Sequence, residues 1–318
     1  MTPEDFWSPF EQTISSMEEA MRLIHNVFLR WSSEGRLFAW RGQVDAGWPL
    51  YSSLYRRLYW TKGGVTPPRE NDLQTAEHQS LVDLHRWGLH QSDRGRLSVL
   101  NQLAMLQHYG SPTRLIDVTF NPLIGLWFAV EEQWENGVEK NGDKDGRLFA
   151  IDVTSRLINE SDERRSWEDA TDRQWPGASG DTRWTEWTTQ TFAWKPSHLN
   201  ARIAAQNGGF LLGGVPALGS GANLKHFRKG SSSADGVWHI DDVRRAESVA
   251  LHLHQVPTTR IGIGRQPDSP AYTIKIEHQA KREIRARLEE LYGYKHATIY
   301  PDYPGFALYG LPHLKQRP

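Results

Sequence analysis

A polar segment at residues 107–122, QHYGSPTRLIDVTFNP, leads directly into an apolar stretch at residues 123–129. Asn121 is a natural helix N-cap and Pro122 suits the first turn of a helix, so the segment ends where a helix begins. A surface loop that feeds a buried helix does not need so many hydrogen-bonding groups, and buried polar groups need partners. We therefore expect many of these side chains to face one another or a ligand in a pocket.

A second segment, FAWRGQ at residues 38–43, places Arg41, Gly42 and Gln43 at the end of a short apolar strand. These residues are in a position to contribute to the same pocket. The helix that begins at Pro122 offers free N–H groups and the positive end of a helix dipole. The pocket therefore suits a phosphate or another anion.

Together the two segments resemble the FRG domain family, which is named for a Phe-Arg-Gly strand end, written here Trp40-Arg41-Gly42. Trp40 departs from the usual phenylalanine. The resemblance continues through residues 49–56 (PLYSSLYR), Glu77, 107–121, 146–153 (GRLFAIDV), 202–210 (RIAAQNGGF) and 300–302 (YPD). It implies a single FRG-type domain over residues 1–318, with a helical part at about 1–135, a β-rich part at about 145–318 and a tryptophan-rich insertion at about 155–195.

The spacing of apolar residues predicts the order of elements. Helical patterns occur at residues 12–32, 71–89, 97–109, 123–134 and 278–292. Strand patterns occur at residues 37–41, 147–153, 202–205, 209–212, 248–253, 271–276 and 297–300. Helices come first and strands later, which favours an α+β fold with N-terminal helices packed on a mixed or antiparallel β-core.

Composition narrows the class of protein. The absence of cysteine excludes disulfides, a thiol nucleophile and thiolate zinc sites, and a net charge of −1 gives no overall attraction to nucleic acid. The N-terminus lacks an apolar leader and no span reaches about 18 apolar residues, so we expect a cytoplasmic protein with no membrane partner. The 14 tryptophans, with a run from Trp167 to Trp194, either pack loops or form a surface that stacks bases or binds a partner.

The order of motifs is also similar to that of the ADP-ribosyltransferase fold, which binds NAD. In that fold an arginine and glycine at a strand end precede a strand with a Ser/Thr motif, a helix, and a strand that starts after a glycine. Arg41-Gly42, Thr119, residues 123–129 and residues 146–149 follow this order. The resemblance implies NAD as a substrate and no metal. It implies the NAD-binding residues Arg41, Gly42, Gln43, Tyr109, Arg114, Thr119, Asn121 and Arg202, and the catalytic residues Arg41, His108, Asp117, Thr119 and Gln206.

Gln206 departs from the pattern of this fold. It lies in the third motif, residues 202–210, where transferases of the arginine-strand type usually have glutamate. A glutamine can hydrogen-bond a ribose hydroxyl but cannot act as a general base. Proton transfer would then fall to Glu77, Asp117 or His108.

The charged residues also have a structural interpretation. Arg41 can be a buried arginine paired with Asp117, and Arg114 and Asp117 can pair with each other or with Arg202. Asp302 is expected in a turn.

The uncharged candidates have structural interpretations too. His108 and Tyr109 can be core side chains, and Thr119 and Asn121 can be caps. Gln43, like Gln206, is less suited to a purely structural role, because a buried amide needs several partners.

Three functions are compatible with this pattern. The first is an ADP-ribosyltransferase-like enzyme that uses NAD to modify a nucleic acid or a protein, as a bacterial toxin or phage-defence effector with an antitoxin or regulatory protein as a partner. The second is a non-catalytic module that binds a nucleotide, a nucleic acid or a protein. The third is a metal-dependent nuclease or hydrolase built on Arg41, His108 and Asp117. His252 and His254 alternate on one strand and could seat a metal, but they have no carboxylate at a matching spacing.

Overall fold

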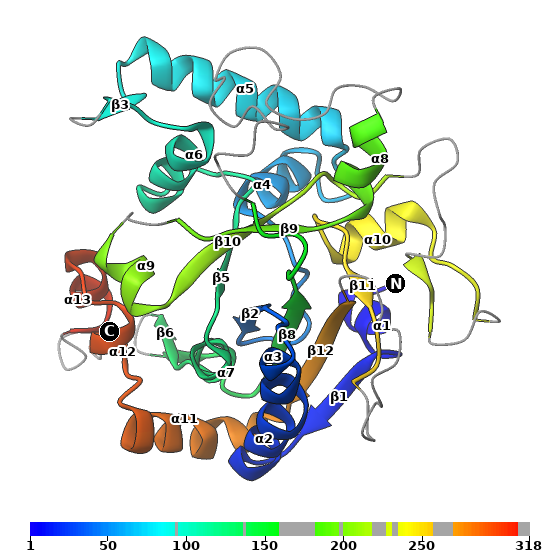
Figure 1. Ribbon diagram of the computed structural model, residues 1–318, viewed down its shortest axis with the longest axis vertical. Coiled ribbons are helices and arrows are strands. Elements are labelled where there is room, and N and C mark those ends of the chain that lie inside the picture. Colours follow the sequence, from blue (N-terminus) through cyan, green and yellow to red (C-terminus); the bar gives the residue numbers. More distant parts are fainter. Residues whose placement is uncertain are drawn as a thin grey trace.

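The computed structural model describes residues 1–92, 95–135, 138–158, 182–196, 200–217, 227–230, 235–256 and 270–310. These residues form an α+β fold around an eight-stranded mixed sheet (Figure 1). Its strands are β1 Glu11–Ile14, β2 Phe38–Gln43, β5 Ile116–Thr119, β8 Gly146–Asp152, β9 Phe192–Trp194, β10 Gly208–Leu212, β11 His252–Leu253 and β12 Pro270–Ile276. The order across the sheet is β1-β12-β8-β2-β5-β10-β9, with β11 also on β12. β1 and β11 run parallel to β12, whereas the other neighbouring strands are antiparallel.

Helices cover both sides of this sheet. Their bounds are α1 Pro3–Trp7, α2 Met17–Leu23, the π-helix η1 Ile24–Leu29, α3 Arg30–Ser33, α4 Ser53–Thr61, α5 Glu70–Arg86, α6 Val99–His108, α7 Pro122–Val130, α8 Thr182–Thr189, α9 Ala201–Ala205, α10 Ile240–Ala246, α11 His278–Tyr292, α12 His296–Ile299 and α13 Tyr303–Tyr309. Two short hairpins, β3 Gln91–Ser92 with β4 Gly95–Arg96 and β6 Gln133–Glu135 with β7 Val138–Lys140, lie outside the sheet.

One face of the sheet packs on α2, η1, α3, α7 and α11, which lie together at the bottom of Figure 1. Phe28, Trp31 and Phe38 form an aromatic cluster with Trp40 and Tyr272 in this layer. The burial of these large rings stabilises the contact between the helices and strands β2 and β12.

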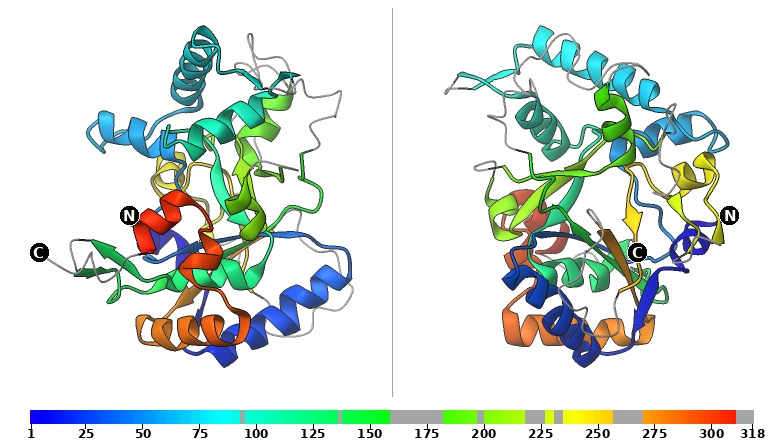
Figure 2. Two further views of the ribbon diagram at one scale, coloured as in Figure 1. Left: turned by 90° about the vertical axis from the view of Figure 1, so that its left-hand side faces the viewer. Right: turned by 45° about the vertical axis from the view of Figure 1, so that its right-hand side comes forward.

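The opposite side is covered in two parts. α1 and α10 pack on the part of the sheet around β8, where Trp7 contacts Phe149 edge to face. α5, α6 and α8 pack over β9 and β10, and the cyan and green helices at the top of Figure 1 belong to this layer. Figure 2 shows α12 and α13 from the side as the red helices; α12 lies beside α9, and its Ile299 is buried in the layer of α7 and α11.

Helix α7 packs closely on strands β2 and β8 because three glycines leave no side chains in the contact. A Cβ on Gly42 would lie 2.2 Å from the carbonyl oxygen of Gly125, and a Cβ on Gly146 would lie 2.3 Å from that of Ala129. A Cβ on Gly125 would lie 2.8 Å from that of Trp40. Gly42 is therefore required for packing, whatever its backbone binds.

Several predicted elements are confirmed, with small shifts at their ends. The strands near residues 37–41, 147–153, 209–212 and 271–276 are β2, β8, β10 and β12, and the helices near 71–89, 97–109 and 278–292 are α5, α6 and α11. Asn121 caps α7 and Pro122 is its first residue, as predicted. The helix expected at 123–134 ends earlier, at Val130, because residues 133–135 form strand β6.

Other predicted elements are correct only in part, or are wrong. The helix expected at 12–32 begins only at Met17, capped by Ser16, since residues 11–14 pair with β12. The strands expected at 202–205 and 297–300 are the short helices α9 and α12, and only residues 252–253 of the strand at 248–253 form a ladder. The order of helices first and strands later is also wrong, because β1, β2 and β5 belong to the sheet.

Among the described residues, no helix is both long and apolar enough to cross a bilayer. The tryptophan run at 167–194 divides in two. Trp167 and Trp175 lie outside the described residues, and Trp187 and Trp194 are buried in the core beneath α5 and α6.

Candidate functional site

The candidate site is a cavity of about 330 Å³ where strands β2 and β5 separate. The two strands pair at one position, Trp40 with Thr119, and their other residues are not paired with each other. We call this cavity the Arg41 cleft. It is lined by residues of β2, β5, β10, α6, α7 and α9 and of the segments that follow α7 and α12, among them Arg41, Gly42, Gln43, Gln107, His108, Asp117, Thr119, Glu131, Asn200, Arg202, Gln206 and Tyr300.

Arg41 enters the cleft from β2 with its side chain one third exposed. Its Nη1 donates to the backbone carbonyl of Asp117 at 3.0 Å and lies 4.0 Å from the carboxylate of that residue. The predicted pair of Arg41 and Asp117 is thus present, but it is a loose and partly exposed one. The Nε of Arg41 is buried and has no hydrogen-bond partner among the described residues. Arg41 therefore keeps a donor free.

Gln43 lies two residues further along the same strand and is buried. Its Nε2 donates to the carbonyl of Pro49 at 3.2 Å. Its Oε1 is buried without a partner among the residues that the structure describes. A buried carbonyl oxygen without a donor is costly, so it is a natural place for a ligand N–H or O–H.

Asp117 faces Arg41 from β5, and its side chain is 63 % exposed. Its Oδ1 accepts a hydrogen bond from Gln107 Nε2 at 2.7 Å, and the other end of Gln107 accepts from the hydroxyl of Thr113. Side chains of the polar segment at 107–122 therefore bond in part to one another. Such mutual contacts are one of the two arrangements that the sequence predicted, the other being contact with a ligand.

His108 of α6 and Arg202 of α9 also line the cleft, and both already have partners. Asn200 Nδ2 lies 3.2 Å from His108 Nδ1. Arg202 makes two hydrogen bonds of 2.7 Å to Asp302, and these bonds hold the pKa of Asp302 below its usual value. Asp302 caps α13 rather than serving only in a turn. Most of the charge of Arg202 is thus neutralised within the protein.

Gln206 and Thr119 reach the cleft where α9 runs into β10. The Thr119 hydroxyl donates to the carbonyl of Gln206 at 2.6 Å, and Gln206 Nε2 donates to the carbonyl of Ile299 at 3.0 Å. These bonds join β5, α9 and α12 around the cavity. Arg41, Gly42, Gln43, His108, Asp117, Thr119, Arg202 and Gln206 therefore come together in one cleft, although the sequence separates them widely.

Three predicted site residues lie elsewhere. Tyr109 is 77 % exposed and lines a separate groove. Asn121 caps α7 through its Oδ1, and its Nδ2 donates to the hydroxyl of Tyr294. Because both ends of its amide are engaged in this way, the structural interpretation of Asn121 is the one the structure favours.

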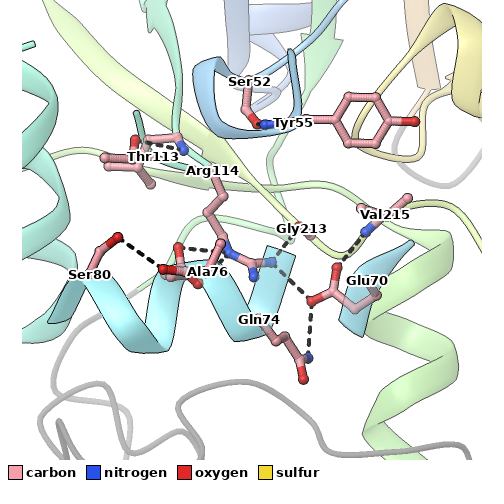
Figure 3. Close-up of polar contacts among 12 residues, drawn as sticks. Ser52, Tyr55, Glu70, Gln74, Ala76, Ser80, Thr113, Arg114, Gly213 and Val215 are labelled. Atoms are coloured by element: carbon pink, nitrogen blue, oxygen red, sulfur yellow. Dashed lines mark hydrogen bonds and ion pairs between the residues drawn. The ribbon is translucent and has the colours of Figure 1, made fainter. Parts of the chain in front are cut away.

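Arg114 is the third, and it is fully buried against helix α5 (Figure 3). Its Nε donates to Glu77 at 2.7 Å and its Nη1 donates to Glu70 at 3.1 Å. The expected pairing of Arg114 with Asp117 is therefore wrong, since two carboxylates of α5 hold Arg114, and Arg202 pairs with Asp302 rather than with Asp117. Glu77 is buried in the same cluster, so it is not available as a base in the Arg41 cleft.

Sequence reasoning missed Glu131, which follows α7 and lines the cleft. It is buried, and its carboxylate accepts hydrogen bonds from Tyr300 at 2.9 Å and from Gln133 at 3.3 Å. Burial raises the pKa of Glu131 above its usual value, although Tyr300 and Arg41 oppose the shift. Glu131 is the first of two consecutive glutamates after an apolar helix, and such a pair gives no periodic signal that could have singled it out.

Two further cavities lie next to the cleft. A groove of about 1560 Å³ between the α5–α6 pair and α9 shares Asn200 and Ile203 with it, and its rim carries the exposed rings of Trp87 and Tyr109. A cavity of about 700 Å³ lies between α12 and α13. Among the described residues, no group of three or more histidines, aspartates and glutamates is arranged to hold a metal ion. His252 Nε2 donates to the backbone carbonyl of Thr189 at 2.7 Å, and burial lowers the pKa of His254 to about 4.

Comparison with known proteins identifies part of the chain. The family model of the FRG domain matches residues 36–137, which include β2, α4 to α6, β5, α7 and Glu131. No curated protein and no solved structure matches the chain. The matched region contributes Arg41, Gln43, His108 and Asp117 to the cleft, whereas Arg202, Gln206 and Tyr300 come from outside it.

Proposed function

Because residues 36–137 form an FRG domain, and because its two signature segments meet at one cavity, we propose that the Arg41 cleft binds NAD and catalyses transfer of its ADP-ribosyl group. The acceptor is a nucleic acid or a protein, and the setting is that of a bacterial toxin or phage-defence effector restrained by an antitoxin or regulatory protein. The order of motifs that resembles the ADP-ribosyltransferase fold supports this choice of chemistry.

The observation that carries the proposal is the pair of unsatisfied atoms in the cleft. Arg41 Nε is a free cationic donor and Gln43 Oε1 is a free acceptor, and both are buried. A guanidinium that keeps a donor free suits a phosphate oxygen, and an amide oxygen beside it suits an amide N–H or a ribose hydroxyl. NAD offers all of these groups within one molecule.

The size of the cleft limits which part of NAD it holds. A volume of about 330 Å³ is at the low end of ligand pockets. It suits the nicotinamide and its ribose phosphate, with the adenosine part outside. The larger groove shares Asn200 and Ile203 with the cleft, so it lies next to the space where the adenosine part would extend.

In the proposed reaction, this chain's residues bind and orient the reacting groups. Arg41 neutralises the phosphate near the scissile bond, and Gln43 fixes the nicotinamide amide or the ribose. Gln206 projects from the turn that follows α9, where its amide can orient a hydroxyl. Such positioning and charge stabilisation are the main contributions a protein can make to breaking a glycosidic bond.

The test is calorimetric titration of the protein with NAD. We expect Arg41→Ala to weaken NAD binding by about 10- to 100-fold, because a charge-assisted hydrogen bond is lost. Gln43→Leu removes the free acceptor and should weaken binding by about 10-fold. The matched control is Arg22→Ala, since Arg22 is an exposed arginine on α2 whose one ion pair within the described part of the chain is with Glu18. Equal affinity for NAD in all four proteins, each folded by circular dichroism, contradicts the proposal.

The second candidate is a module that binds a nucleotide or a partner without turnover. The exposed Trp87 and Tyr109 beside a large groove favour it, because exposed aromatic rings are a common binding surface. This candidate predicts binding without release of nicotinamide. The two candidates therefore differ in whether nicotinamide is released.

A further inference from the structure

Glu131 is a carboxylate that the fold shields from water inside the Arg41 cleft. Its side chain is 4 % exposed, compared with 63 % for Asp117 across the cavity. Among the described residues, no lysine or arginine lies within ion-pair distance of it, and its one oppositely chargeable neighbour at that range is the imidazole of His296, at 3.6 Å. A buried carboxylate that is not neutralised by a cation is costly, and such groups are concentrated at functional sites.

The carboxylate is held in place by groups that keep it ready to exchange a proton. Tyr300 donates to Oε1 and Gln133 donates to Oε2, and Tyr309 adds a third hydrogen bond. The ring of Tyr309 stacks on those of Tyr300 and His296 at 5.0 and 4.1 Å. These contacts fix the position of Glu131 without supplying a positive charge.

The other candidate bases of the cleft are less suited to this role. Asp117 is exposed and accepts a hydrogen bond from Gln107. Glu77 is tied to Arg114, and an amide such as Gln206 cannot accept a proton near neutral pH. His108 lines the cleft from α6, and its Nδ1 already has Asn200 Nδ2 as a partner at 3.2 Å.

We infer that Glu131 is a catalytic residue of this cleft, and that its carboxylate accepts the proton of the nucleophile that attacks the ribose; this assignment rests on the proposed function. The bond from the ribose C1′ to the nicotinamide nitrogen breaks, and its electron pair leaves with neutral nicotinamide. The acceptor's oxygen or nitrogen bonds to C1′, and its proton passes to a carboxylate oxygen of Glu131 and then to water.

The charges around Glu131 determine how the reaction depends on pH. Burial raises its pKa, whereas Tyr300, Gln133, Tyr309 and Arg41 lower it. Burial also lowers the pKa of His296, which lies beside Glu131. Glu132, the next residue in the chain, pairs with Arg285 of α11. Because the ionised carboxylate is the active form, the rate should rise with pH as Glu131 loses its proton.

The first test compares Glu131→Gln with Glu132→Gln. Both changes remove one carboxylate and keep its shape, but Glu132 pairs with Arg285 and does not line the cleft. For Glu131→Gln we expect nicotinamide release to fall by about 10² to 10⁴-fold, with the Kd for NAD within about threefold of wild type. Glu132→Gln should retain the wild-type rate.

The second test uses Tyr300→Phe, which removes one hydroxyl and keeps the ring. The loss of a hydrogen bond to the carboxylate raises the pKa of Glu131 further, so the rise of the rate with pH should move to higher pH. A purely structural role for Tyr300 would lower the amount of folded protein and leave the position of this rise unchanged.

The outcomes separate this inference from the proposed function. Wild-type turnover with an equal rate in folded Glu131→Gln, or an unmoved profile in Tyr300→Phe, would overturn the role of Glu131 and leave the NAD site standing. Wild-type protein that neither binds NAD nor releases nicotinamide would overturn the proposed function, and the role of Glu131 with it.

Discussion

At the scale of single residues, the polar segment at 107–122 serves two purposes. Asp117 and His108 face the cleft, whereas Arg114, only three residues before Asp117, is turned into the core. The sequence could not separate these roles, because Glu70 and Glu77 lie on a helix distant in the chain. Only the folded arrangement shows that two carboxylates already neutralise this arginine.

This distinction predicts that Arg114→Met destabilises the protein by about 3–5 kcal/mol, because it leaves the two buried carboxylates of Glu70 and Glu77 without their cation. Urea unfolding followed by tryptophan fluorescence measures the change. Arg202→Met is the comparison, since its partner Asp302 is less buried and the loss should be smaller. An Arg114→Met protein as stable as wild type, but unable to bind NAD, would assign Arg114 to a ligand.

At the scale of elements, long periodic segments were predicted well and short ones were not. α5, α6 and α11 have enough turns for their apolar spacing to be read, and β2, β8 and β12 are buried runs. α9 and α12 span only 201–205 and 296–299, where a helix and a strand present similar patterns. Asn200, which caps α9 through its side chain, was the local signal that could have corrected that assignment.

The contact of β2 with α7 makes a prediction at this scale. Gly42→Ala places its Cβ against backbone atoms of α7 at 2.2 to 2.8 Å, so strand and helix must separate. We expect a loss of about 3 kcal/mol in the free energy of unfolding. Gly125→Ala meets the Cβ of Trp40 at 2.8 Å and the Cδ1 of Leu148 at 3.1 Å; the Leu148 side chain can shift and no backbone atom lies as close as in Gly42→Ala, so the change should cost less. Chemical denaturation measures the loss in the free energy of unfolding for both variants. A larger loss for Gly125→Ala than for Gly42→Ala would show that β2 and α7 are not packed in this way.

At the scale of the whole molecule, the cleft exists because β2 and β5 pair at one point and then part. The sequence predicted that segments 38–43, 107–121 and 202–210 would meet, and the structure confirms that residues of all three line one cavity. The separation of the strands was not predictable, since it depends on β8 and β10 pairing with their other edges. For the same reason Glu131 and Tyr300 were missed, because tertiary packing alone places them beside Arg41.

The most direct test of the account is mass spectrometry of the purified protein after incubation with NAD and fractions of cellular RNA, DNA and protein. The account predicts release of nicotinamide together with an ADP-ribosyl mass increase on one fraction, both lost in Arg41→Ala and retained in Arg22→Ala. Intact NAD and unmodified fractions with folded wild-type protein would contradict it.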